Sequence, residues 1–209
     1  MAGVGNSDLQ STAAICARTL EQVAGHDWSV RAAELDWTVG QTLSHVAGCL
    51  MNYAASLASR TQQQLPFRMS PPVRRDGTPM RPADLIQAME VAAAILGAVV
   101  AEAAPDARGY HVTGLADPEG FAAMGCDEML VHTEDIMNAF SLSFHPPPDL
   151  CRAVLARLFP WAPEAAPWDA LLWANGRRAL PGHARLGRDW AWQGPPLSEW
   201  DGTIKTYRD

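Results

Sequence analysis

Three ionisable side chains near residue 130 have a spacing that suits metal chemistry. Glu128 and His132 are four residues apart, and Asp135 follows three residues later. On a helix with about 100° per residue, His132 lies about 40° and Asp135 about −20° from Glu128, so the three share one stripe. Glutamate and histidine one turn apart can converge on a single divalent ion. Asp135 would then orient a ligand or serve as an additional one.

The rest of that stripe is apolar, so its ionisable members need an explanation. Its apolar members are Phe121, Met124, Val131 and Ala139. Burying a charge without a partner costs free energy, so the three groups either bind a metal or satisfy one another. The structural alternative is a neutral histidine paired with a buried carboxylate, and the Glu-x-x-x-His spacing alone fits both.

Other candidate residues are a histidine in an earlier segment and two arginines near the C-terminus. His45 lies about 160° from the apolar stripe of its own helical segment, which by itself predicts a side chain that faces solvent. The small residues beside it, Gly48 and Cys49, could instead mark a second packed face or the opening of a site. Arg177 and Arg178 follow Asn175-Gly176 at a helix end, where a guanidinium is either solvated or clamps a carboxylate. The other histidines lie in loops or at segment ends, and we expect surface positions for them: His26, His111, His145 and His183.

Four long segments with helical periodicity would position these residues. The first begins at a capping box of Ser7 and Gln10, and the second at one of Thr38 and Gln41. The third begins at Pro82, which suits a first helical turn, and the fourth runs from Asp117-Pro118 to about Phe140. The apolar stripes of the first three segments are Leu9, Ala13, Cys16, Leu20 and Val23; Leu43, Val46, Leu50, Ala54 and Leu57; and Leu85, Met89, Ala92, Leu96 and Val99.

The connecting segments predict how these helices are joined. The polar, proline-containing stretch 61–81 is long enough for a crossover, and 109–120 is typical of a loop. Prolines 146–148 mark a break, followed by short helices at 149–159 and 168–174 and a small hairpin at 189–192. We therefore predict an all-α fold: a four-helix bundle over residues 1–142, with an irregular C-terminal extension over 143–209 that packs on the bundle.

Composition excludes several classes of protein. A chain of 209 residues with 48% hydrophobic and 19% charged residues suits one folded domain with a tail. A net charge of −7 argues against nucleic acid or an anionic membrane as partner. We see no apolar run of about 18 residues and no secretory leader, so we expect a cytoplasmic protein without a membrane span. The widely spaced cysteines should be reduced thiols and exclude a zinc knuckle: Cys16, Cys49, Cys126 and Cys151.

Three blocks of the sequence resemble the DinB-like, mycothiol-dependent maleylpyruvate isomerase family. The first is WTVGQTLSHVAG, residues 37–48, and the second is GLADPEGFAAMGCDEMLVHTEDI, residues 114–136. The third, WANGR at 173–177 with LPG at 180–182, is similar to an element of many actinobacterial relatives. The likeness covers most of the chain, and the first two blocks are fairly specific in combination.

The resemblance implies a DinB-like four-helix bundle that binds a divalent metal through His45, Glu128 and His132. Zinc is favoured, with nickel or manganese as alternatives. Three ligands leave a coordination position open, which members of the family use for a low-molecular-weight thiol, mycothiol in actinobacteria. A metal-bound thiol ionises near neutral pH and can attack a small electrophile. The lysine-poor composition, in which Lys205 is the only lysine, agrees with a GC-rich actinobacterial host.

Three functions are compatible with these residues. The first is a metal-dependent mycothiol transferase or isomerase, with Asp135 and Arg177 in catalytic roles and Arg177 also contacting an anionic group of a ligand. The second is a metal-dependent hydrolase on the same bundle, in which the metal activates water. The third is a non-catalytic protein that binds an apolar metabolite. The expected partners are a small electrophile and a thiol, with a homodimer as an open alternative for the assembly.

Overall fold

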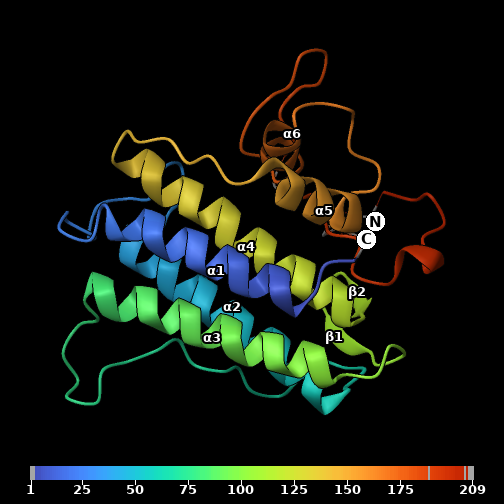
Figure 1. Ribbon diagram of the computed structural model, residues 1–209, viewed down its shortest axis with the longest axis horizontal. Helices are drawn as coiled ribbons and strands as arrows, with labels where there is room; N and C mark the ends of the chain where they lie inside the picture. The colour runs from blue at the N-terminus through green and yellow to red at the C-terminus, as the bar shows by residue number, and fades with distance from the viewer. Residues whose placement is uncertain (1–2, 188, 205, 207–209) are drawn as a thin grey trace.

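A computed structural model describes residues 3–187, 189–204 and 206 as a helical bundle with a C-terminal cover (Figure 1). The prediction of an all-α four-helix bundle is confirmed. The elements in chain order are α1 (Asn6–Glu21), α2 (Val39–Ser59), α3 (Pro82–Glu102), β1 (Gly109–His111), β2 (Gly114–Ala116), α4 (Pro118–Ala139), α5 (Pro148–Leu158), α6 (Pro167–Ala174) and the 3-10 helix η1 (Leu197–Glu199).

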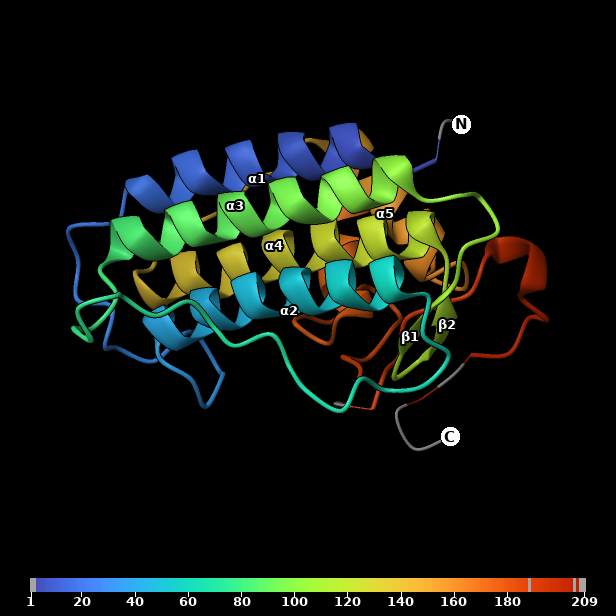
Figure 2. The same cartoon turned by 90° about the horizontal axis from the view of Figure 1, so that it is seen from below.

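The four long helices form the bundle, and α1 and α2 each pack against both α3 and α4. The crossover between α2 and α3 runs back along the length of the bundle, so these two helices point in the same direction (Figure 2). The predicted long crossover is therefore confirmed. It places the start of α2 near the start of α3, and leaves one side of α2 facing α4.

Local capping explains where three of these helices begin. Thr38 and Gln41 form the predicted capping box of α2, because Thr38 Oγ1 accepts the Gln41 N–H at 3.2 Å and Gln41 Oε1 accepts the Thr38 N–H at 2.9 Å. Asp117 Oδ1 accepts the Gly120 N–H at 2.8 Å and caps α4. The predicted cap at Ser7 is wrong: α1 begins at Asn6, because Asp8 Oδ2 accepts the Gly5 N–H at 2.9 Å.

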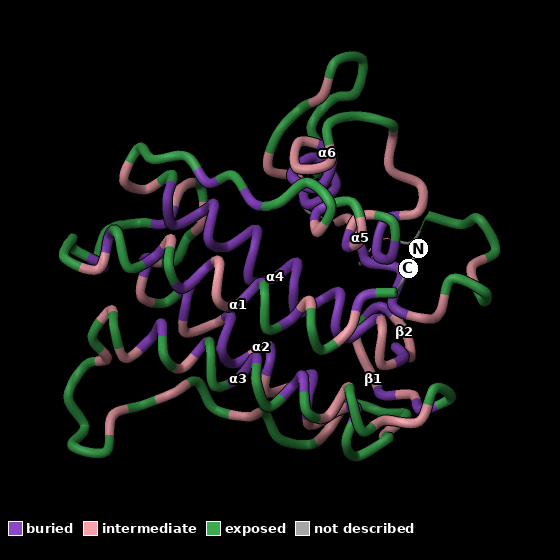
Figure 3. The backbone as a smooth tube through the Cα atoms, in the orientation of Figure 1, coloured by how far each residue is buried: buried purple, intermediate pink, exposed green. Residues whose placement is uncertain are grey.

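Helix α4 occupies the centre of the molecule, with every residue from Gly120 to Met137 buried (Figure 3). It is covered by α1, α2 and α3 and by α5 of the C-terminal extension. At Gly125 a Cβ atom would come within 3.0 Å of Leu9, Leu50 and Leu96, one leucine from each of the other bundle helices. Four carboxylates of α4 are buried because this stretch of the helix has no solvent face: Asp127, Glu128, Glu134 and Asp135.

Helix α3 is the one described helix that is long and apolar enough to cross a membrane. Its mean hydropathy reaches 1.7 over 18 residues. The predicted stripe positions Leu85, Met89 and Leu96 are buried in the core that the other bundle helices share. Packing in the bundle accounts for these positions, but only 39% of that window is buried, and Val91 and Ile95 are exposed.

Backbone pairing differs from the prediction in two short segments. The predicted loop at 109–120 contains an antiparallel hairpin of β1 and β2, in which Tyr110 pairs with Leu115. Strands of three residues are too short to show an alternating pattern in the sequence. The hairpin expected within residues 189–192 is wrong. Trp190 instead forms an isolated antiparallel bridge with Thr206, farther along the chain.

Buried polar contacts join the C-terminal extension to α4. Arg157 on α5 is 2% exposed, and its Nη2 donates to Asp117 Oδ1 at 2.5 Å. Asp127 accepts from Asn175 Nδ2 at 3.0 Å and from Trp192 Nε1 at 2.9 Å. The hydrophobic core also continues into the extension through residues such as Leu158. The division at residue 142 into a bundle and an extension stays a prediction.

Candidate metal centre

The three ionisable residues of the predicted stripe on α4, Glu128, His132 and Asp135, lie together as their spacing predicts. His132 Nε2 is 3.3 Å from Glu128 Oε2, and His132 Nδ1 is 3.0 Å from Asp135 Oδ2. All three residues are buried. The imidazole of His132 is thus held between two carboxylates of its own helix.

His45 on α2 completes this cluster from the neighbouring helix. Its Nε2 lies 3.7 Å from Glu128 Oε2, and its ring meets that of His132 edge-on at a centroid distance of 5.4 Å. The solvent-facing position that the helical pattern predicts for His45 holds in part, since its side chain is 35% exposed and its ring edge is turned toward α4. The pattern misled in part because α2 has two packed faces: the leucine stripe faces the core, and the His45 face lies against α4.

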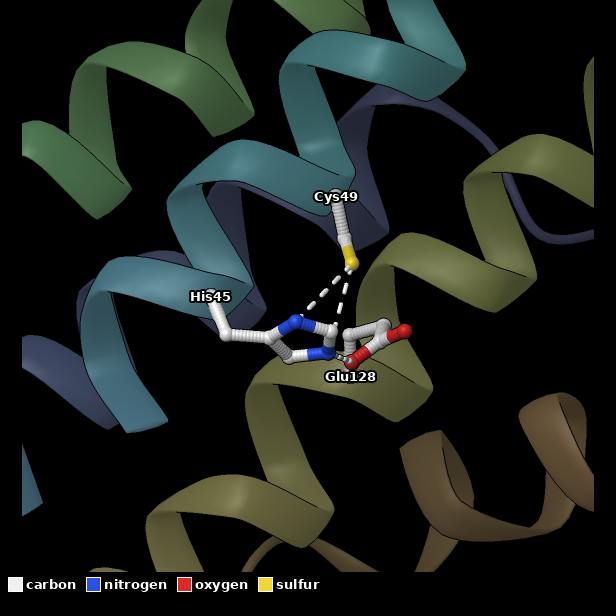
Figure 4. Close-up of side chains that lie close together, drawn as sticks. All are labelled: His45, Cys49 and Glu128. Carbon is white, nitrogen blue, oxygen red and sulfur yellow. Dashed lines mark hydrogen bonds and ion pairs between the residues drawn. The ribbon is translucent and has the colours of Figure 1, made fainter. Parts of the chain in front are cut away.

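Cys49 and Tyr53 also reach the cluster from α2, and sequence reasoning missed both. One ligand atom from each of His45, Cys49 and Glu128 lies within 4.8 Å of the other two (Figure 4). Cys49 Sγ is 3.4 Å from His45 Nε2, and the Tyr53 hydroxyl donates to Glu128 Oε1 at 2.8 Å. The available signal was the spacing of four residues between His45 and Cys49, which is the spacing of Glu128 and His132.

Arg177 supports the cluster through Asp135. Its Nη2 donates to Asp135 Oδ2 at 2.8 Å, its Nε to Asp135 Oδ1 at 3.4 Å, and its Nη1 to the Asn175 carbonyl at 2.9 Å. The neighbouring Arg178 pairs instead with Asp169, away from the cluster. Arg177, Asp135 and His132 therefore form a connected chain. A contact between Arg177 and an anionic ligand stays a prediction.

The cluster perturbs the pKa values of its members. Burial opposes the charged form of His132, but hydrogen bonds to Asp135 and Glu128 prevail and raise its pKa to about 9. Burial likewise disfavours ionised Glu128, yet His132 and His45 hold the pKa of this carboxyl below its usual range. Burial lowers the pKa of His45 and raises that of the Cys49 thiol. A buried imidazolium beside ionised carboxylates is therefore the preferred state of His132 without a metal.

These donor atoms fit a divalent cation. Two imidazole nitrogens and one carboxylate oxygen are typical ligands of zinc and related metals. His132 Nδ1 donates its proton to Asp135, so Nε2 is the nitrogen that points toward Glu128 Oε2. A histidine ligand usually has such a carboxylate partner on its other nitrogen. Protonation of His132 Nε2 and binding of a cation there would therefore compete with each other.

Two clefts border the cluster, and His45 and Pro71 line both of them. The indole cleft, with a volume of about 660 Å³, is lined chiefly by Trp28, Trp37, Met80 and Leu85. The polar cleft, of about 350 Å³, is lined by residues that include Asn52, Arg68, Tyr53, Cys49 and His111. Of the cluster, His45 lines the indole cleft, and His45, Cys49 and Tyr53 line the polar cleft, whereas Glu128 and His132 line neither.

His111 is the one loop histidine that the fold brings to a cleft bordering the cluster. Its Nδ1 accepts the Thr113 N–H at 3.3 Å, so the neutral ring carries its proton on Nε2. Burial lowers its pKa to about 4 and keeps it neutral. The surface position expected for His111 is wrong because the β1–β2 hairpin folds it against Tyr53 and Trp192.

The fold and this cluster together define an all-α, DinB-like four-helix bundle with a candidate metal site between α2 and α4. Residues 9–137 match the family described as the mycothiol maleylpyruvate isomerase N-terminal domain. The chain therefore belongs to that family, and the predicted resemblance is confirmed. No curated protein and no solved structure gave a match to the chain.

Proposed function

We propose that this protein is a divalent-metal-dependent thiol transferase or isomerase, with His45, Glu128 and His132 as the metal ligands. The observation that carries the proposal is the approach of His45 Nε2 and His132 Nε2, from different helices, to the same oxygen of Glu128. Membership of a family named for mycothiol supports mycothiol as the thiol. We infer zinc as the first choice of metal, with nickel and manganese as alternatives, and the cytoplasm as the compartment.

The protein's own residues would prepare this site for thiol chemistry. Asp135 holds the proton on His132 Nδ1, and Arg177 holds Asp135, so both are proposed as positioning residues. Tyr53 donates to Glu128 Oε1 and leaves Oε2 for the metal. When bound, a divalent cation would lower the pKa of a coordinated thiol and supply a thiolate at neutral pH.

The transfer reaction makes one bond to sulfur. The thiol loses its proton to water, its sulfur bonds to an electrophilic carbon, and a leaving group departs with the electron pair of the bond that breaks. In an isomerisation the sulfur instead adds to a double bond, and rotation and elimination follow, so the thiol is regenerated. Both reactions need a small electrophile to reach the cluster, and the clefts that His45 lines would admit it.

Replacing His45 by alanine should weaken metal binding by about ten- to a hundredfold or more, an effect at least as large as loss of a typical supporting residue. The imidazole supplies the only proposed ligand from α2, and α4 alone would provide two. Competition with a chromophoric zinc chelator measures the change. Wild-type affinity in this variant would show that the ligand set is assigned wrongly.

Mycothiol added to the cobalt-substituted protein should produce a sulfur-to-metal charge-transfer band at neutral pH. Cys49 lies close enough to the cluster to give such a band itself, so the experiment uses the Cys49→Ala background, in which sulfur at the cluster must come from the added thiol. The thiol should also stabilise the fold, by about 2.7 kcal/mol at a hundred times its dissociation constant. The band should be lost in Glu128→Gln and retained in Arg178→Ala, whose arginine pairs with Asp169.

The same experiment separates thiol transfer from the other functions. If mycothiol and simpler thiols give neither a band nor a thermal shift in a protein that binds cobalt, thiol transfer is wrong and metal-dependent hydrolysis becomes the better account. If the purified protein binds no stoichiometric divalent ion, a non-catalytic metabolite-binding role is the remaining explanation.

A further inference from the structure

We propose that the indole cleft binds an uncharged aromatic or apolar electrophile beside His45. This inference rests on the proposed function and adds the class of the second substrate to it. It differs from what the family description suggests, since maleylpyruvate is a dicarboxylate. Three features of the protein support it: the lining of the cleft, the hydrogen bonds that its polar residues already make, and the positions of the nearby arginines.

The lining of the indole cleft is apolar and aromatic. Trp37 is 41% exposed and its ring lies 4.5 Å from that of His45, measured between centroids. Trp28, Met80 and Leu85 line the cleft beside it. A half-exposed indole next to a candidate metal ligand offers a flat surface on which an aromatic ring can stack. The volume of about 660 Å³ is within the range of small-molecule sites.

Most polar groups of this cleft are already hydrogen-bonded within the protein. Thr38 and Gln41 bond to each other's backbone in the cap of α2. The Ser29 hydroxyl donates to Asp27 Oδ1 at 2.7 Å, and the Trp28 indole donates to the Val23 carbonyl at 2.9 Å. The cleft therefore presents less polarity to a ligand than its residue types suggest.

No arginine, lysine or carboxylate is among the residues lining the indole cleft in the described part of the chain. In the metal-free chain a carboxylate ligand would lose water there without gaining a cationic side chain as partner. A divalent ion held by His45 would be the one cation nearby, which is why the test includes the metal-free chain. Arg177 is bonded to Asp135 and lines neither cleft, and Arg68 lines the polar cleft. The lining therefore selects against anionic electrophiles.

The position of the cleft suits a second substrate. Because His45 lines both clefts, a molecule in the indole cleft borders the cluster from one of them while the polar cleft is left for the thiol. The polar cleft also has apolar residues such as Leu65 and Phe67, and its Asn52 is bonded to the backbone of Gly48 and Met69. It carries the charged Arg68, for which the indole cleft has no counterpart, and this suits a hydrophilic thiol. The two reactants would then meet at the ring of His45.

The test compares two probes of matched shape and different charge, 1,3-dinitrobenzene and 3,5-dinitrobenzoate. Neither carries a leaving group, so isothermal titration calorimetry of the zinc-loaded and metal-free full chain reports binding without reaction. We expect 1,3-dinitrobenzene to bind at least about tenfold more tightly than the benzoate, because the carboxylate must be desolvated. Trp37→Ala should weaken binding of 1,3-dinitrobenzene by about tenfold through loss of the stacking surface.

The matched control is Phe67→Ala, which removes an exposed aromatic side chain of the polar cleft. It should leave the affinity for 1,3-dinitrobenzene unchanged. Equal affinity for the two probes, or an effect of Phe67→Ala in place of Trp37→Ala, would overturn the assignment. Failure of the proposed function can be told apart from failure of the cleft assignment. Selective binding that depends on Trp37, without a cobalt–thiol band, would support the cleft assignment and contradict thiol transfer.

Discussion

Alanine in place of His132 is expected to abolish stoichiometric binding of a divalent metal. The change removes the imidazole that lies 3.3 Å from Glu128 Oε2 and leaves His45 as the only histidine at the cluster. The experiment uses the Cys49→Ala background, because Cys49 would otherwise remain beside His45 and Glu128 as a third donor. Two ligands from different helices then bind zinc far more weakly than three. The measurement is elemental analysis of protein that has been loaded with zinc and then freed of unbound metal by gel filtration.

Two further variants give this experiment its controls. His145→Ala removes an exposed histidine and should retain one metal per chain. Asp135→Asn should reduce affinity by about ten- to a hundredfold, because the amide holds His132 less firmly than the carboxylate does. Circular dichroism checks that each variant is folded, which matters since removing His132 leaves Glu128 and Asp135 buried without this partner. A folded His132→Ala protein with full metal occupancy would refute the proposed ligand set.

Arg157→Met should lower the free energy of unfolding by about 3–5 kcal/mol, the usual cost of breaking a buried ion pair. The Arg157 guanidinium is 2% exposed and bonds to Asp117 and to the Gln193 and Gly194 carbonyls. Its removal leaves the Asp117 carboxylate poorly compensated at the start of α4, and leaves two carbonyls of the C-terminal extension without this donor. Urea unfolding of the metal-free protein measures the loss.

The matched control for this prediction is Arg152→Met on the same helix. Arg152 is 49% exposed and pairs with Asp149, which is almost fully exposed, so its loss should cost at most about 1 kcal/mol. The double variant Asp117→Asn with Arg157→Met should recover part of the stability, because no charge then remains buried at this point. Equal losses in the two single variants would mean that Arg157 does not hold the extension to α4.

Helix positions followed closely from the sequence because their signals are local. Thr38 with Gln41, and Asp117 with the following proline, are contacts within one turn, and the structure shows both. The cap at Ser7 was misplaced because Asp8 offers a stronger acceptor to the Gly5 N–H, and both signals lie within three residues of each other. Competing local signals of this kind shift a helix end without changing the helix.

In the candidate site, too, contacts within one helix were predictable from the sequence and contacts between helices were not. The relation of Glu128, His132 and Asp135 was predictable from spacing alone, because residues three and four apart on one helix are always neighbours. His45 was not: its helical pattern predicted exposure, and only the family resemblance placed it with the other ligands. Cys49 and Tyr53 lie on that same face of α2, and their relation to Glu128 depends on how α2 packs against α4.

The sequence by itself therefore determined the six α-helices and their approximate limits, the stripe of ionisable groups on α4, and the family to which the chain belongs. Only the tertiary structure decided which groups face that stripe from other elements. The contacts of Arg177 with Asp135 and of Arg157 with Asp117 each join residues about forty positions apart in the sequence. His45 and Glu128 are still farther apart in the sequence. Such contacts are set by the angles between packed helices and by the path of the connecting segments, which no local pattern encodes.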